Sequence, residues 1–248
     1  DFTILLGNVV DHFDTALYAF IAPIMAPLFF PSEDPVVQLI MAYSVFATSM
    51  VTRPLGAYLF GLLARNKGAS RALSHSLVGV GVFTFLIGLL PTHQAIGWGA
   101  ALLFIILRTI VEIFAAGESA VSRLYILKDK AENEAFKNSY LHQISTILGV
   151  VVASFAAMFV QYMEDDSSWR LMYFLGGSAA IIGYFLRKSA NGFENKEFQK
   201  KLDIYDRFGI GALMTHKMQI FRIFMVNGIS HLTYVIPFIT MNHLVPLM

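Results

Sequence analysis

Long apolar runs recur along almost the whole chain and are separated by short polar breaks. A helix that spans a bilayer needs about 20 mostly apolar residues. Seven runs meet this requirement, at residues 2–30, 36–64, 72–90, 96–127, 138–163, 169–187 and 219–245. Lipid offers no partner to an exposed backbone N–H or C=O group, and the runs are too long and too uniformly apolar for barrel strands. The pattern therefore predicts an all-α, polytopic bundle of transmembrane helices in a lipid bilayer.

The composition excludes several classes of protein. Hydrophobic residues make up 56% of the chain and charged residues only 14%, whereas soluble domains carry about 25% charged residues. The net charge of +1 gives no electrostatic case for a nucleic-acid partner. The absence of cysteine excludes disulfides and thiolate metal sites. No nucleophile elbow, HExxH motif or phosphate-binding loop is present, so we expect neither an enzyme nor a bound metal or cofactor.

Basic residues fall on alternate connections between the runs. The connections after the second, fourth and sixth runs hold Arg65, Lys67, Arg71, Arg123, Lys128, Lys130, Lys137 and the lysines and arginines of residues 187–217. The other connections hold Glu33, Asp34 and residues 164–166, all acidic, and no lysine or arginine. Short cytoplasmic loops of membrane proteins are enriched in lysine and arginine. The amino terminus and the ends of the even-numbered runs are therefore predicted to be cytoplasmic.

Only one long polar segment interrupts the pattern, and it follows the sixth run. Its apolar residues recur at roughly helical spacing, at Phe193, Phe198, Leu202, Tyr205 and Phe208. This spacing favours an amphipathic cytoplasmic helix over a flexible linker. We expect a six-helix half at residues 1–187, a linker at 188–218 and the first helix of a second half at 219–248. Because the chain begins without methionine and ends in an apolar run, we expect it to need a carboxy-terminal half that it lacks.

Ionisable side chains interrupt three of the apolar runs. The first run carries Asp11, His12 and Asp14, with Tyr18 one turn further on, the second carries Arg53, and the fourth carries Arg108, Glu112 and Glu118. Such groups are costly inside a bilayer, and by default they mark functional sites. These residues, apart from His12, are therefore candidates for a solute and proton pathway, together with His142 and Gln143 in the fifth run.

Helical geometry predicts which charges meet. Asp11, Asp14 and Tyr18 share one stripe of their helix. Asp14 and Arg53 each lie roughly 16 Å from the cytoplasmic end, at about 1.5 Å per residue. The matching depth predicts that Arg53 can pair with Asp14 or with Asp11.

The fourth run holds two further relations. Arg108 and Glu112 are one turn apart and are expected to neutralise each other. Glu118 points about 80° away from Arg108, so we expect it to serve another neighbour or a cytoplasmic gate. A carboxylate in the bilayer can carry a proton, because burial disfavours its charged form while a nearby arginine favours it. The alternative is that these pairs only hold the helices together.

The histidines leave two interpretations open. His12 adjoins Asp11 and either titrates near neutrality or serves only as a hydrogen-bonding residue. His142 begins a polar stripe with Thr146 and Gly149, and this stripe either lines a cavity or bonds a neighbouring helix.

Two segments resemble a known family. Residues 7–18 read GNVVDHFDTALY and residues 53–61 read RPLGAYLFG. They are similar to the G-N-x-x-E-W-[FY]-D-F-x-[LV]-Y and R-P-x-G-A-x-x-F-G signatures of the metabolite:proton symporter branch of the major facilitator superfamily. That branch includes proline/betaine, citrate, 2-oxoglutarate and shikimate carriers. Further support lies within residues 7–187, at Arg108, Gly117, Glu118, Ser139, Gln143, Trp169, Arg170 and residues 174–176.

The resemblance implies a fold and a function. The fold would have two six-helix halves, each with inverted three-helix repeats, and this chain would hold the first half and one helix of the second. The function would be secondary active transport by alternating access, with protons driving symport of a small carboxylate-bearing metabolite or zwitterionic osmolyte across a bacterial inner membrane. Asp14, Arg53 and Arg108 would line or flank the central site, where an arginine suits a carboxylate.

Some positions depart from the pattern. The superfamily's gating loop after the second helix, G-x-x-x-D-[RK]-x-G-R-[RK], aligns with a segment that includes Gly61, Arg65, Gly68 and Arg71, with Arg65 in place of the aspartate. In the fourth run Val111 and Glu112 replace Gln-Gly, and in the first His12 replaces a tryptophan. The altered loop and the added Glu112 favour an alternative function, a non-transporting membrane receptor or scaffold that retains the carrier fold.

Overall fold

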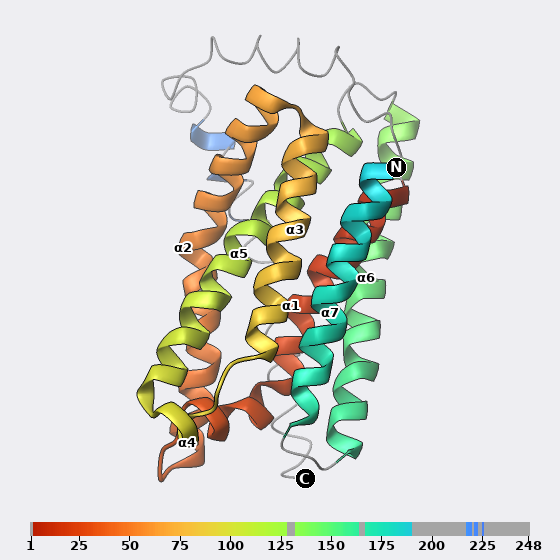
Figure 1. The fold of residues 1–248 in the computed structure, drawn as a ribbon. Coiled ribbons are helices and arrows are strands. Elements are labelled where there is room, and N and C mark those ends of the chain that lie inside the picture. Colours follow the sequence, from red (N-terminus) through yellow and green to blue (C-terminus); the bar gives the residue numbers. More distant parts are fainter. Residues whose placement is uncertain are drawn as a thin grey trace, which may run out of the picture. The chain divides into compact units, whose positions relative to one another are not determined.

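The computed structural model describes residues 2–127, 132–163 and 167–189, and short stretches between 217 and 225. The helices of the first of its two units, residues 1–195, are α1 (Phe2–Phe29), α2 (Pro35–Lys67), α3 (Ala69–Gly88), α4 (His93–Ile96), α5 (Trp98–Leu127), α6 (Glu132–Tyr162) and α7 (Ser168–Ser189). The six long helices run up and down side by side in this unit (Figure 1). The all-α prediction is confirmed, and the first six apolar runs each correspond to a long helix.

Two sequence predictions fall outside the described residues. The amphipathic helix expected between residues 187 and 217 lies almost wholly there, and so does most of the seventh run at 219–245. The boundary between the two compact units lies at residues 195–196. The proposed division into a six-helix half, a linker and the start of a second half therefore stays a prediction.

Four of the described helices are long and apolar enough to cross a membrane. They cover residues Thr3–Phe29, Ala69–Gly88, Trp98–Ile126 and Asn133–Tyr162. The helices α2 and α7 are not among these four: the described side chains of α2 include a shorter apolar stretch at Pro35–Phe46, and α7 carries Arg170, Arg187 and Lys188. Both are nevertheless of spanning length, with 33 and 22 residues.

Two glycines set helix boundaries that the apolar pattern placed elsewhere. Gly68 has a φ of 95° and is the single residue between α2 and α3. Gly97 has a φ of 61° and separates the short helix α4 from α5. Positive φ is readily adopted only by glycine. The expected loop over residues 65–71 is therefore wrong, because Arg65 and Lys67 continue α2 and Arg71 lies in the first turn of α3.

The helix packing has the pattern of an inverted repeat. The most extensive contacts are α1 with α6, α2 with α5, and α3 with α7. If α1, α2 and α3 are exchanged with α5, α6 and α7, the first two contacts map onto each other and the third maps onto itself. The α3–α7 contact lies at the centre of this relation. There a methyl group on Gly81 would lie 2.9 Å from the Gly177 carbonyl oxygen, so these helices touch backbone to backbone.

An aromatic cluster fills the core beside the central charges. Phe29 and Phe104 lie 5.0 Å apart between ring centroids, and Phe29 meets Trp169 edge-on at 5.5 Å. Tyr18 lies 5.4 Å from Phe104. All four side chains are fully buried. This packing joins α1, α5 and α7 into a rigid frame around the polar groups described next.

Candidate functional site

A buried carboxylate and a buried arginine meet in the middle of the bundle. Asp14 of α1 forms an ion pair with Arg108 of α5, and their side chains are 4% and 1% exposed. The second carboxylate oxygen of Asp14 accepts a hydrogen bond from Thr84 of α3 at 3.0 Å. The Tyr18 ring lies under the guanidinium, 5.1 Å from its carbon to the ring centroid, where a cation–π interaction adds stability. Three helices thus hold one neutralised charge pair.

The pair continues into a longer line of charges that ends at an exposed arginine. Glu112, one turn after Arg108 on α5, lies 3.5 Å from a terminal nitrogen of Arg108. Its other oxygen accepts from Nε of Arg53 on α2 at 3.1 Å. Glu112 is 3% exposed, whereas the Arg53 side chain is 41% exposed. We call Asp14, Arg108, Glu112 and Arg53 the central charge chain; its two acids and two arginines sum to zero.

The expected partner of Arg53 was wrong. Arg53 makes its ion pair with Glu112 and not with Asp14 or Asp11. The reason is that α2 packs chiefly on α5, so α5 supplies the acid that faces Arg53. The expected contact between Arg108 and Glu112 is present, although Glu112 also serves Arg53 and Arg108 also serves Asp14.

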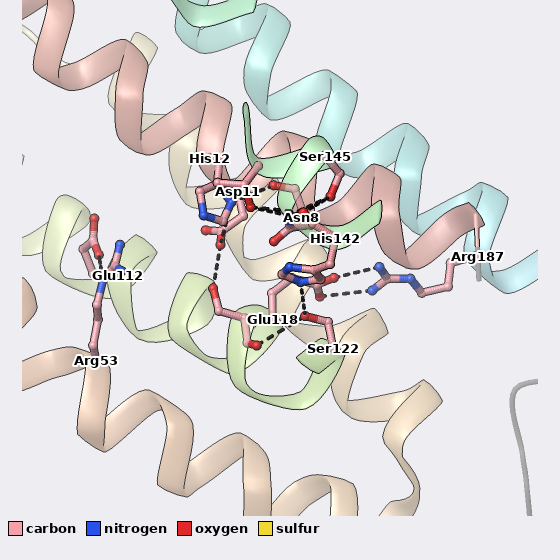
Figure 2. A network of polar contacts seen from close by, with 12 residues as sticks. Asn8, Asp11, His12, Arg53, Glu112, Glu118, Ser122, His142, Ser145 and Arg187 are labelled. Carbon is pink, nitrogen blue, oxygen red and sulfur yellow. Dashed lines mark hydrogen bonds and ion pairs between the residues drawn. The ribbon is translucent and has the colours of Figure 1, made fainter. Parts of the chain in front are cut away.

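A second polar cluster joins α1 to α5 and α6, and Figure 2 shows it close by. The amide nitrogen of Asn8 donates to the hydroxyls of Ser145 and Thr146 and to the His142 carbonyl, at 2.8, 2.9 and 3.2 Å. Asp11 accepts from the Ser119 hydroxyl at 2.7 Å. One oxygen of Asn8 and one of Asp11 are buried without a hydrogen-bond partner among the described residues.

Both histidines have polar neighbours in the structure, and the choice between the two interpretations of His12 stays open. Nδ1 of His12 lies 2.9 Å from the carbonyl oxygen of Asn8 and 3.8 Å from Asp11. His142 is buried, with Nε2 at 3.5 Å from the Ser122 hydroxyl of α5. Its stripe therefore bonds neighbouring helices. Gln143, the next residue, is exposed.

A third set of charges lies toward the end of the bundle where α1 begins. Glu118 of α5 and Arg187 of α7 form a two-pronged ion pair, with nitrogen–oxygen distances of 2.7 and 3.1 Å (Figure 2). Ser76 donates to Glu118 at 2.7 Å, and Arg187 donates to the carbonyls of Leu73 and Thr3 at 2.7 and 3.1 Å. Glu118 is 0% exposed and Arg187 is 2% exposed. Four helices converge on this pair, and Glu118 indeed serves a neighbour other than Arg108.

Comparison with known proteins assigns the chain to a family. The family model described as "Sugar (and other) transporter" matches residues 2–190. The chain belongs to this family. It is 29% identical over 214 residues to the proline/betaine transporter of Escherichia coli K12, which covers 83% of this chain and 42% of that protein. It is 26% identical over 196 residues to the alpha-ketoglutarate permease of the same organism, which covers 77% of this chain and 45% of the permease.

Solved structures confirm the major facilitator superfamily fold. The xylose transporter XylE from E. coli, in a partially occluded inward-open conformation, matches with a TM-score of 0.66 and 17% identity. The match covers 92% of this chain and 58% of XylE. The chain spans about half the length of the relatives it matches. The expected resemblance is confirmed, and the family consists of transporters rather than enzymes.

The residues of the expected gating loop lie in and between the helices α2 and α3. Gly61 lies within α2, where a methyl group in its place would meet no atom within 4 Å. Arg65 contacts the side chain of its neighbour Asn66 at 3.4 Å. The role of these residues in gating solute access from the cytoplasm stays a prediction.

Several residues that complete these clusters were missed by the sequence reasoning. They are Ser76, Thr84, Ser119, Ser122 and Arg187. The serines and the threonine occur in apolar helices without any distinguishing spacing. Arg187 was counted only as part of the basic stretch that follows the sixth run. In the sequence Arg187 stands next to Lys188 at a helix end. Nothing there distinguishes the buried Arg187 from its exposed basic neighbour.

Proposed function

We propose that this protein is a secondary active transporter that couples proton movement to symport of a small carboxylate-bearing metabolite or zwitterionic osmolyte. Family membership supports the transport class, and the similarity to a proline/betaine transporter and an alpha-ketoglutarate permease supports the solute class. Alternating access would move two helical halves about a central site. The complete transporter would need a second half, of which this chain would hold the first helix.

The observation that carries the proposal is the buried Asp14–Arg108 ion pair. Removing one charge from a buried pair typically costs about 3–5 kcal/mol, and without the Asp14 charge Arg108 would keep only Glu112, at 3.5 Å. A proton on Asp14 would remove its negative charge and so weaken its hold on Arg108. A helix arrangement that suits the ionised pair would then no longer suit the protonated one. Proton binding and helix position are coupled in this way without any further group.

The same proposal includes a place and an orientation in the cell. The basic last turns of α2 and α7 lie at the end of the bundle where α1 begins (Figure 1). Glu33 and Asp34 lie at the opposite end, between α1 and α2. By the positive-inside rule the basic end would face the cytoplasm of a bacterial inner membrane, with the linker at 188–218 on the same side.

Uptake into proteoliposomes tests this function. The full-length protein is reconstituted and given an acidic outside, with radiolabelled L-proline, glycine betaine, 2-oxoglutarate, citrate or shikimate as the solute. We expect accumulation of at least one solute, and loss of this accumulation when an ionophore collapses the gradient. Vesicles without protein and a variant of the exposed loop residue, Glu33→Gln, are the controls. If no solute accumulates, or if the ionophore changes nothing, the symporter proposal fails.

The receptor alternative predicts a different result in the same preparation. It is favoured by Arg65, which stands where the family's loop has an aspartate that can latch the gate. A receptor would bind solute with measurable affinity and yet show no flux under any gradient. Binding by isothermal titration calorimetry beside the uptake assay therefore separates the two functions.

A further inference from the structure

Arg53 has unused hydrogen-bonding capacity at membrane depth. Its Nε donates to Glu112 at 3.1 Å, while its two terminal nitrogens make no hydrogen bond to any residue in the described part of the chain. The arginine guanidinium is a planar fork whose donors match a carboxylate in two-pronged geometry. Arg53 therefore has free donors on the one member of the central charge chain that is substantially exposed.

The position of Arg53 decides what the exposed side chain faces. It lies roughly 21 Å from the last residue of α2 and roughly 27 Å from the first, at about 1.5 Å per residue. A guanidinium at such depth is not stable against hydrocarbon, and charged groups in membrane helices face the bundle interior or a water-filled cavity. A solute that enters from water would thus meet Arg53 before the buried Asp14–Arg108 pair.

Glu112 already presents a carboxylate to this arginine from inside the protein. It is 3% exposed and is held on its other side by Arg108 at 3.5 Å. If Arg53 moved to another carboxylate, Glu112 would keep the arginine one turn before it on α5. The charge of Glu112 therefore stays compensated in both arrangements, and exchange of the carboxylate on Arg53 leaves no unpaired buried ion.

We propose that Arg53 is the receptor for the carboxylate group of the solute and that Glu112 is an internal competitor that the solute's carboxylate displaces. The inference rests on the proposed transport function and names the recognised chemical group. It also gives a role to Glu112, which occupies a position where the signature resembled in the fourth run has glycine. An internal carboxylate that must be displaced weakens every carboxylate ligand, so weakly held anions are excluded from the site.

Equilibrium binding to the full-length protein in detergent tests the inference. The probes are L-proline, glycine betaine, 2-oxoglutarate, citrate and shikimate, and L-prolinamide is the match to proline that lacks the carboxylate. We expect at least one carboxylate to bind and L-prolinamide to bind at least about tenfold more weakly than L-proline if proline is the ligand. Failure of all five carboxylates to bind overturns the assignment, as does equal binding of proline and its amide.

Two variants test the roles of the individual side chains. Glu112→Gln keeps the shape but removes the competing charge, so it should tighten carboxylate binding about twofold to fivefold, as expected for a partly exposed ion pair. Arg53→Lys keeps the charge but loses the fork, so it should weaken binding about tenfold or more. Glu33→Gln applies the same chemical change to an exposed loop and should leave the affinity unchanged. Weaker or unchanged binding by the Glu112→Gln protein contradicts the competitor role.

The failure of this inference and the failure of the proposed function are distinguishable. Proton-driven uptake of solute by wild type, together with unchanged affinity in the Glu112→Gln protein, removes the competitor and leaves the transporter. Carboxylate binding with the predicted variant effects, but without proton-driven flux, keeps the receptor role of Arg53 and removes the symporter. Thermal unfolding of each variant shows whether a loss of binding reflects a loss of fold. If Arg53→Lys is unfolded, Arg53→Gln is measured in its place.

Discussion

The Glu118–Arg187 pair gives a prediction whose magnitude follows from the structure. Replacement of Arg187 by methionine keeps most of the side-chain volume but leaves the Glu118 carboxylate fully buried. Among the described residues, the Ser76 hydroxyl alone would still donate to it. Breaking a buried pair by removing one partner costs about 3–5 kcal/mol. The carbonyls of Leu73 and Thr3 also lose their donor, so we expect the upper part of that range.

A stability loss of this size is measurable by thermal unfolding. Each 1 kcal/mol lowers Tm by roughly 2–4 °C for a chain of 150–250 residues and by less for a longer one, so Arg187→Met should lower the Tm of the full-length protein by up to about 10 °C. Adding Glu118→Gln to that variant removes the orphaned charge and should recover much of the loss, since buried pairs are often replaceable as a unit. The adjacent exposed lysine gives the control Lys188→Met, for which little change is expected.

The measurement is differential scanning fluorimetry of the purified full-length protein in one detergent. The reasoning is refuted if Arg187→Met and Lys188→Met unfold at the same temperature. It is also refuted if the double variant is less stable than Arg187→Met alone, because the orphaned Glu118 carboxylate would then not be the source of the loss.

Two further predictions concern packing and the aromatic support of the central arginine. Gly81→Leu should lower stability by about 1–3 kcal/mol, because any side chain there meets the backbone at Gly177, whereas Gly61→Ala should be neutral or raise stability by up to about 1 kcal/mol in an open helical position. Equal effects in a thermal unfolding assay would argue against close packing of α3 on α7. Tyr18→Phe should lower the free energy of unfolding by about 0.5–1.5 kcal/mol, because it removes a hydrogen bond to a carbonyl of α2. Tyr18→Leu should lower it further, because Arg108 also loses its contact with the aromatic ring. A leucine variant as stable as the phenylalanine variant would contradict the cation–π contact.

The helices and the charged residues could be predicted from the sequence, but most of the contacts between them could not. Apolar runs of about 20 residues predict helices because lipid enforces one backbone solution. The depth of Asp14 and Arg53 was also accessible from the helical rise. Depth does not reveal which helices are neighbours, however. Because α2 packs on α5, Arg53 forms its ion pair with Glu112. Asp14 pairs with Arg108 instead.

The contacts of small polar residues and the exact ends of helices could not be predicted from the sequence, for a related reason. Thr84 and Ser76 look the same as other hydroxyl residues in apolar helices, and only the fold shows that they face Asp14 and Glu118. Gly68 looks like one residue of a loop, yet its positive φ alone makes the turn between α2 and α3. In both cases the decisive property is a position in three dimensions.

In the proposed mechanism a proton on Asp14 couples helix movement to solute transport. The most direct test compares two assays of Asp14→Asn in proteoliposomes, with the solute that the wild-type protein accumulates. One is accumulation driven by a pH gradient, and the other is exchange of labelled for unlabelled solute without a gradient. Asparagine keeps the shape and cannot carry the proton. The account predicts that gradient-driven accumulation is lost while exchange persists, which also shows that the variant is folded. Accumulation by Asp14→Asn at the wild-type rate would contradict it.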